Sequence, residues 1–202
     1  MAESPRWAGP QRRIGLTGGI ATGKSSVGRW LAAARGLPLL DADLYAREAL
    51  ARGSDGEAAV LAQFGAAVQA PEGGIDRAAL GQRVFADPSE RQWLEQLVHP
   101  LVRQRFAAEL QRLVSAPVVV LMIPLLFEAG LESLCSEIWL VDCTPEQQLE
   151  RLIARDRCSP EQARARIAAQ WPLARKRPLA DLVLDNSGPP QAWQQAAGRA
   201  LG

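Results

Sequence analysis

The stretch Thr17-Gly18-Gly19-Ile20-Ala21-Thr22-Gly23-Lys24-Ser25-Ser26 decides the fold of this chain. From Gly18 it matches G-x-x-x-x-G-K-S, the phosphate-binding loop. Residues 13–16 before it predict a short buried strand, and residues 27–34 after it predict a helix. Strand, loop and helix in this order are the context that the motif requires, which argues against the alternative of a glycine-rich turn with a chance Lys-Ser.

The chemistry of this loop follows from its residue types. Glycines allow successive backbone N–H groups to turn toward a phosphate without a Cβ in the way. The N-terminus of the following helix adds partial positive charge. Lys24 can reach the β- and γ-phosphates, and the hydroxyl of Ser25 can ligate Mg²⁺. The loop therefore predicts a bound nucleoside triphosphate with Mg²⁺.

Composition excludes several classes of function. The chain has 202 residues, 48% hydrophobic content and a net charge of +1, which predict one soluble globular domain and no nucleic-acid partner. Three cysteines without metal spacing fit a reducing compartment. The N-terminus lacks the apolar run of a signal peptide, and the longest apolar run, residues 118–127, is too short to span a bilayer. We expect a cytoplasmic protein with no membrane contact and no obligate protein partner.

Two acids follow the second predicted strand, residues 37–40. Asp41 and Asp43 lie where ligands bind in open parallel sheets, beyond the carboxyl ends of the strands. One of them could accept a proton from an attacking hydroxyl, and the other could hold a water of Mg²⁺ or the loop. The alternative is that both simply cap the helix predicted over residues 44–51.

From residue 44 to about residue 114 the pattern is helical. This region is too long for one crossover helix, so it predicts an inserted helical subdomain that holds a second substrate. It contains His99, the only histidine, followed by Pro100 and, one turn later, Arg103. The alternative for His99 is a packed residue at a helix kink.

The third predicted strand, residues 118–123, leads to Pro124-Leu125-Leu126-Phe127-Glu128. Glu128 could contact metal or substrate, or it could be a surface acid or a helix cap. Strands are also predicted over residues 138–141 and 181–184. Between them lies a helical hairpin with eight basic and four acidic residues, in which Arg151 and Arg155 share one helix face. It predicts a lid over the γ-phosphate, the alternative being an exposed helix pair with solvated arginines.

The predicted fold class is α/β: a three-layer, parallel five-stranded sheet with a phosphate-binding loop, a helical substrate-binding insertion and a helical lid. Residues 1–12 are predicted to be a flexible extension, and residues 13–202 a single domain. Its core comprises residues 13–44, 115–145 and 180–202, the acceptor-binding insertion residues 45–114, and the lid residues 146–179.

Absent motifs narrow the class. There is no N-K-x-D and no L-S-G-G-Q, which disfavours a guanine-nucleotide switch and a transporter ATPase. Asp185 and Gly188 match D-x-x-G, but on the last strand, where that motif could not sense a γ-phosphate. The acid pair and the arginine-rich lid favour a kinase of a small molecule that bears a hydroxyl.

Residues 13–188 resemble dephospho-coenzyme A kinases. The loop is common to many families, whereas the other motifs are specific at these spacings. They are Leu40-Asp41-Ala42-Asp43, Ala46-Arg47-Glu48, Ile75-Asp76-Arg77 with Leu80 and Val84-Phe85, His99-Pro100 with Arg103, Pro124 to Glu128, Arg155-Asp156, Arg166-Ile167, Gln170, Lys176, Ala180-Asp181, Asn186 and Gly188.

The resemblance implies transfer of the γ-phosphate of ATP to the ribose 3′-hydroxyl of dephospho-coenzyme A. It implies Asp43 as general base, with Lys24 and Arg155 in catalysis. The implied ATP-binding residues are Gly19, Ala21, Thr22, Gly23, Lys24, Ser25, Ser26 and Arg151. The implied acceptor-binding residues are Asp41, His99, Arg103, Leu125 and Glu128. A kinase of another small alcohol and a non-catalytic nucleotide binder remain alternatives.

Two details have no role assigned by spacing. Family loops usually read G-x-G-x-G-K, but Ala21 stands where glycine is common, which costs about 1 kcal/mol if this position needs a positive φ. Of 23 basic residues only Lys24 and Lys176 are lysine, so Lys176 is either a random surface residue or a site where a compact ammonium is required.

Overall fold

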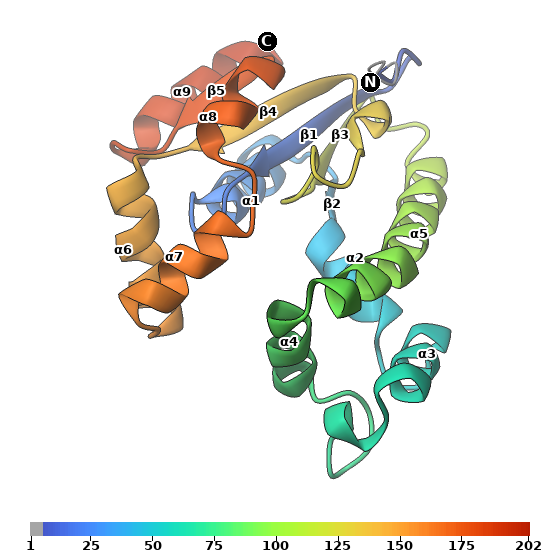
Figure 1. Ribbon diagram of the computed structural model, residues 1–202. Helices are drawn as coiled ribbons and strands as arrows, with labels where there is room; N and C mark the ends of the chain where they lie inside the picture. The colour runs from blue at the N-terminus through green and yellow to red at the C-terminus, as the bar shows by residue number, and fades with distance from the viewer. Residues whose placement is uncertain (1–5) are drawn as a thin grey trace. The chain divides into compact units, whose positions relative to one another are not determined.

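The structure is a computed structural model that describes residues 6–202 (Figure 1). The chain forms two compact units. The first unit combines the chain up to Asp41 with Leu113–Gly202, and the second comprises Ala42–Arg112. Within the described residues, no helix is long and apolar enough to cross a membrane.

The first unit is built on a five-stranded sheet. Its strands are β1 (Arg12–Gly18), β2 (Leu39–Asp41), β3 (Val118–Met122), β4 (Glu137–Asp142) and β5 (Leu182–Asp185). They are all parallel and stand in the order β2-β3-β1-β4-β5. The predicted parallel sheet is therefore confirmed. Because β1 lies between β3 and β4, the loop that follows β1 leaves the sheet between the carboxyl ends of its two neighbours.

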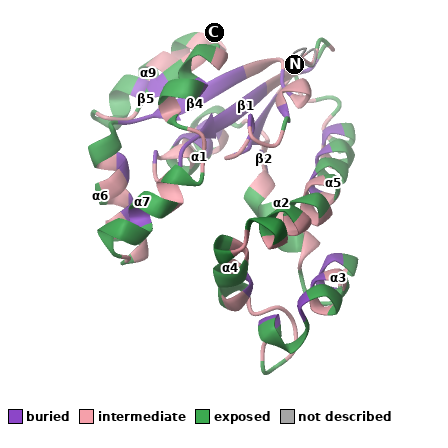
Figure 2. Ribbon diagram, viewed as in Figure 1, coloured by how far each residue is buried: buried purple, intermediate pink, exposed green. Residues whose placement is uncertain are grey.

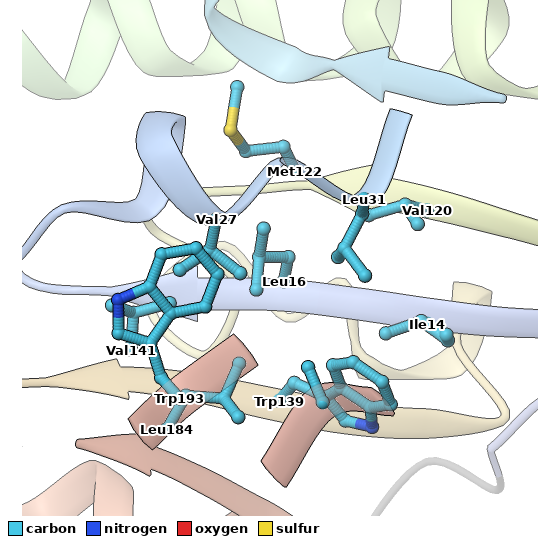
Figure 3. Close-up of a cluster of buried hydrophobic side chains, with 11 residues drawn as sticks. Ile14, Leu16, Val27, Leu31, Val120, Met122, Trp139, Val141, Leu184 and Trp193 are labelled. Carbon is cyan, nitrogen blue, oxygen red and sulfur yellow. The ribbon is translucent and has the colours of Figure 1, made fainter. Parts of the chain in front are cut away.

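Side chains of β1 alternate between the two faces of the sheet. Ile14 and Leu16 are fully buried in a cluster with α1 (Lys24–Arg35) and α9 (Pro190–Leu201), shown in Figure 3. Burying each of these side chains stabilises the fold by about 1.5–3 kcal/mol. On the other face, a Cβ on Gly15 would lie 2.5 Å from Sγ of Cys135 and 2.8 Å from Leu126. Glycine at position 15 therefore lets the loop after β3 pack directly on the strand, and Figure 2 shows how deeply β1 and β4 are buried.

Two helix starts in the first unit carry sequence signals that are typical of N-caps. Thr144 caps α6 (Pro145–Asp156), and Ser159 caps α7 (Pro160–Ala168) with a complete capping box. Each helix has proline in its first turn, where no backbone donor is needed. Then follow α8 (Leu173–Lys176) and a 3₁₀ turn, Arg177–Leu179; another 3₁₀ turn, Glu132–Leu134, precedes β4.

The second unit is helical, as predicted for the insertion. It contains α2 (Ala42–Ala49), α3 (Asp55–Phe64), a 3₁₀ turn (Gly65–Val68), α4 (Arg77–Ala86) and α5 (Pro88–Arg112). Its own core holds Val60, Phe64, Val68 and Leu80. Asp76 caps α4 by accepting hydrogen bonds from the N–H groups of Ala78 and Ala79. The helix after β2 begins at Ala42 rather than at residue 44, so Asp43 belongs to a first helical turn and not to a strand end.

The N-terminal segment, predicted to be a flexible extension, makes contacts with the first unit. Residues 1–5 lie outside the described residues, but from residue 6 on the chain is tied to the first unit. Arg6 pairs with Asp181, the backbone N–H of Trp7 donates to the carbonyl of Cys135 at 3.0 Å, and Gln11 donates to the carbonyl of Leu113 at 2.7 Å. Residues 6–12 thus make specific contacts with the first unit, and the flexibility of the extension stays a prediction. These contacts are long-range, so no local pattern could indicate them.

The turn between β1 and α1 uses left-handed backbone at two positions. Gly23 has φ 100°, and a Cβ there would lie 2.2 Å from Nδ2 of Asn186, so only glycine fits. Ala21 has φ 60°, a region that non-glycine residues enter at a cost of roughly 1–2 kcal/mol. Position 21 therefore has the positive φ at which alanine is less favourable than the glycine that is common at this position.

We expect Ala21→Gly to raise the free energy of unfolding by up to about 1 kcal/mol, because relief of strain outweighs the greater entropy of glycine in the unfolded chain. Urea unfolding measures it. The matched control is Ala33→Gly on the exposed side of α1, which should lower stability by about 1 kcal/mol. Equal destabilisation by both variants would contradict a strained Ala21.

Candidate active site

The loop after β1 is shaped to receive an anion. Thr22 is buried, and its hydroxyl donates to the carbonyl of Gly19 at 3.0 Å, which folds the loop back on itself. Gly23 caps α1 without a side chain, and the first turn of α1 has no acidic residue. Ser25 and Ser26 are exposed in this turn. The helix N-terminus therefore presents its donors and its dipole to solvent, as a phosphate site requires.

Lys24 lies back over the loop. Its Nζ donates to the carbonyl of Gly19 at 2.8 Å and to that of Gly18 at 3.3 Å. The ammonium is therefore held at the loop and not in solvent. In this position it would contact a phosphate bound in the loop.

Two glutamines hold the backbone of Ile20 from opposite sides. Nε2 of Gln148, on α6, donates to the carbonyl of Ile20 at 2.8 Å, and Oε1 of Gln170 accepts from the N–H of Ile20 at 2.8 Å. Gln148 is buried, and a Cβ on Gly19 would lie 2.5 Å from its Nε2. The start and the end of the predicted lid thus fix the loop. Sequence reasoning missed Gln148 because no motif marks it, and it left Gln170 without a role.

Arg151 is connected to the loop through Asn186. Nδ2 of Asn186 donates to the carbonyl of Thr22 at 2.8 Å, and Nη2 of Arg151 donates to the carbonyl of Asn186 at 2.9 Å. Nη1 of Arg151 is buried and has no hydrogen-bond partner among the residues that the structure describes. Asn186 was not predicted as a site residue, although its place after the last strand puts it at the same edge of the sheet.

Arg155 pairs with its neighbour Asp156. The carboxylate of Asp156 receives Nε of Arg155 at 2.7 Å and Nη1 of Arg166 at 2.5 Å. Hydrogen bonding to Arg155 lowers the pKa of Asp156 and, reciprocally, raises the pKa of the guanidinium. The side chain of Arg155 is 55% exposed. Two lid arginines therefore share one carboxylate, and the structure does not place Arg155 on the loop.

Glu128 and Lys176 form a buried ion pair. Lys176 is fully buried, and its Nζ lies 2.7 Å from Oε1 of Glu128. Oε1 also accepts from the backbone N–H of Trp171 at 3.0 Å. The alternative of Lys176 as a random surface residue is thus wrong. Leu125, also predicted at the site, is half-buried in the same loop after β3.

The remaining predicted residues lie on two elements. Asp41 is half-buried and ends β2, and Asp43 follows two residues later, exposed in the first turn of α2. His99 is half-buried and Arg103 is exposed on α5. Since they are four residues apart in a helix, His99 and Arg103 share one side of it.

The described part of the chain has no group of three or more His, Cys, Asp or Glu side chains that could hold a metal ion. The exposed hydroxyl of Ser25 at the helix start can supply one hard oxygen ligand. A Mg²⁺ ion there would therefore need ligands from substrate phosphates and water, which is how Mg²⁺ is commonly bound.

Comparison with known proteins identifies relatives over nearly the whole chain. The model of the family described as dephospho-CoA kinase matches residues 12–191. A dephospho-CoA kinase of Synechococcus sp. (strain CC9605) is 65% identical over 95% of this chain and 92% of its own length. One of Prochlorococcus marinus (strain MIT 9313) is 61% identical over 94% of this chain and 95% of its own length.

Solved structures agree. The structure of TT1252 from Thermus thermophilus has a TM-score of 0.81 and 39% identity, covering 95% of this chain and 96% of that one. Dephospho-CoA kinase from Campylobacter jejuni has a TM-score of 0.66 and 25% identity, covering 94% of each chain. The phosphate loop, the sheet order and these relatives lead to one conclusion. This chain belongs to the dephospho-CoA kinase family.

Proposed function

We propose that this protein transfers the γ-phosphate of ATP to the ribose 3′-hydroxyl of dephospho-coenzyme A, giving coenzyme A and ADP, and that it does so in the cytoplasm without an obligate protein partner. The observation that carries this proposal is family membership over residues 12–191, a span that includes the loop, the acid pair and the lid arginines.

The loop binds the donor. Backbone groups of residues 19–26 surround the ATP phosphates, and Lys24 neutralises charge on them. Arg151 supports the proposal independently. Its Nη1 is buried and has no partner in the described residues, and an oxygen of a bound nucleotide would accept a hydrogen bond from it. Ser25 would hold Mg²⁺, which when bound neutralises phosphate charge.

The acceptor side uses acids and the insertion. Asp43 takes the proton of the attacking hydroxyl, a role that suits an exposed carboxylate two residues beyond the end of β2. We assign contacts with dephospho-coenzyme A to Asp41, His99, Arg103 and Leu125, and leave Glu128 out of this assignment because its Oε1 is already engaged by Lys176 and by the N–H of Trp171. His99 and Arg103 support this assignment by presenting a donor and a cation on one side of α5.

Arg155 acts on the transferred phosphoryl group. Asp156 holds its guanidinium in the same bidentate manner in which an arginine binds phosphate oxygens. Exchange of the carboxylate for phosphate would therefore conserve the hydrogen bonds of Arg155 and add charge neutralisation in the transition state.

The direct test is a coupled assay of the purified protein with ATP, Mg²⁺ and dephospho-coenzyme A, in which we expect ADP and coenzyme A in equal amounts. A panel of other small alcohols tests the alternative of a different acceptor. Nucleotide binding without acceptor-dependent ADP formation would instead identify a non-catalytic binder.

For Asp43→Asn we expect kcat to fall on the order of 10²-fold or more, because the amide cannot accept the proton, while ATP binding is retained. Steady-state kinetics and ATP-induced thermal stabilisation measure the two effects. Asp55→Asn is the matched control, since Asp55 is also exposed in a first helical turn, on α3. A wild-type rate for Asp43→Asn would remove the base assignment.

For Arg155→Ala we expect kcat to fall on the order of 10³-fold, the lower end of what arginines at transferring phosphoryl groups contribute. Arg164→Ala removes another exposed cation, from the lid helix α7, and should change kcat less than about twofold. If the two variants lose the same activity, general lid charge matters and Arg155 has no specific role.

A further inference from the structure

The buried ion pair between Lys176 and Glu128 has no part in the reaction as proposed so far. Lys176 is one of the largest fully buried side chains, and besides Glu128 its Nζ contacts the carbonyl of Pro124 at 3.5 Å. Burying a charge pair rarely adds stability relative to apolar residues, because desolvation offsets the attraction. The pair therefore calls for another explanation.

Glu128 joins two points of the segment that ends the lid. Its Oε1 accepts from Lys176 on α8 and from the backbone of Trp171 before α8. The Trp171 ring lies parallel to that of Phe127, with centroids 6.5 Å apart, and Arg175 lies 3.2 Å from its centroid. The start of this segment and its end are thus both held to the loop that follows β3.

The same segment is held at two neighbouring strands. Gln170 accepts from the N–H of Ile20 in the phosphate loop after β1, and Arg177 pairs at 2.5 Å with Asp142, the last residue of β4. Since the sheet order is β3-β1-β4, residues 170–177, which we call the lid anchor, connect three adjacent strand ends. The phosphate loop lies at the middle of the three.

We infer that Lys176 is a positioning residue for phosphoryl transfer: through Glu128 it fixes the lid anchor, and through Gln170 the anchor fixes the Ile20 peptide of the phosphate loop. The inference rests on the proposed kinase function. Ile20 directly precedes Ala21, which has a positive φ, so the direction of the loop donors depends on how this peptide is held. Loss of the pair should therefore weaken the binding of ATP and leave the binding of dephospho-coenzyme A unchanged.

The test compares two single variants with a control, at a temperature where circular dichroism shows them folded. Lys176→Met is expected to raise KM for ATP about tenfold or more and to change KM for dephospho-coenzyme A less than twofold. Gln170→Ala, which leaves the ion pair intact, should give the same split. Arg164→Met, which removes an exposed cation of α7 outside the lid anchor, is the matched control and should leave both constants within twofold.

The double variant Lys176→Met with Glu128→Gln separates positioning from mere folding. It leaves no unpaired buried charge, so its Tm should recover at least half of the loss seen in Lys176→Met. KM for ATP should stay raised at least fivefold. If KM for ATP recovers together with Tm, the pair is only structural and the inference is wrong. If Lys176→Met does not fold, the double variant and Gln170→Ala decide the question by the same criterion.

Two further results would overturn the inference. One is a rise in KM for dephospho-coenzyme A alone, which would place the pair on the acceptor side. The other is an unchanged affinity for ATP, measured by calorimetry, in Lys176→Met, in Gln170→Ala and in the double variant. Calorimetry needs no turnover, so a wild-type protein that binds ATP without phosphorylating the acceptor would refute the proposed function and still leave the positioning role measurable.

Discussion

Everything at this site depends on holding one short stretch of backbone in an unfavourable conformation. The loop after β1 must turn its N–H groups toward a phosphate, and this requires left-handed φ at Ala21 and Gly23. Such a turn needs support, since alanine there costs free energy and the side-chain hydrogen bonds within the loop end on the carbonyls of Gly18 and Gly19. Side-chain amides supply the support: Gln148 and Gln170 hold the peptide groups on either side of Ile20, and Asn186 holds the carbonyl of Thr22.

These amides connect the lid segment and the end of the last strand to the phosphate loop. Asn186 reaches the loop because β5 ends at the same edge of the sheet as β1. Gln148 and Gln170 come from the two ends of the lid segment, so a displacement of either end would move or break a hydrogen bond to the backbone of Ile20. The loop, the lid segment and the last strand therefore form one connected hydrogen-bond system within the first unit.

The sequence predicted those features that local rules determine. The five strands follow from apolar runs, and the helical insertion follows from the long helical pattern between the second and third of them. The phosphate loop is likewise local. By contrast, the contacts of Arg6, Trp7 and Gln148 join residues far apart in the chain, and no composition or spacing encodes them. The helix after β2 was predicted to start at residue 44, two residues late, because α2 begins at Ala42 without a distinct capping signal.

The chain has only two lysines, and both lie at positions with a specific structural environment. A chain with 21 arginines keeps lysine where the cation must fit between oxygens in little space. Lys24 donates to two loop carbonyls, and Lys176 lies between a carboxylate and a carbonyl with no exposed surface. A guanidinium would bring five donors, and a fully buried site with two acceptors would leave several of them unsatisfied. The rarity of lysine was therefore a real signal at both positions, but only the structure shows that the second lysine pairs with Glu128, which also binds the backbone of Trp171 next to the loop-binding Gln170.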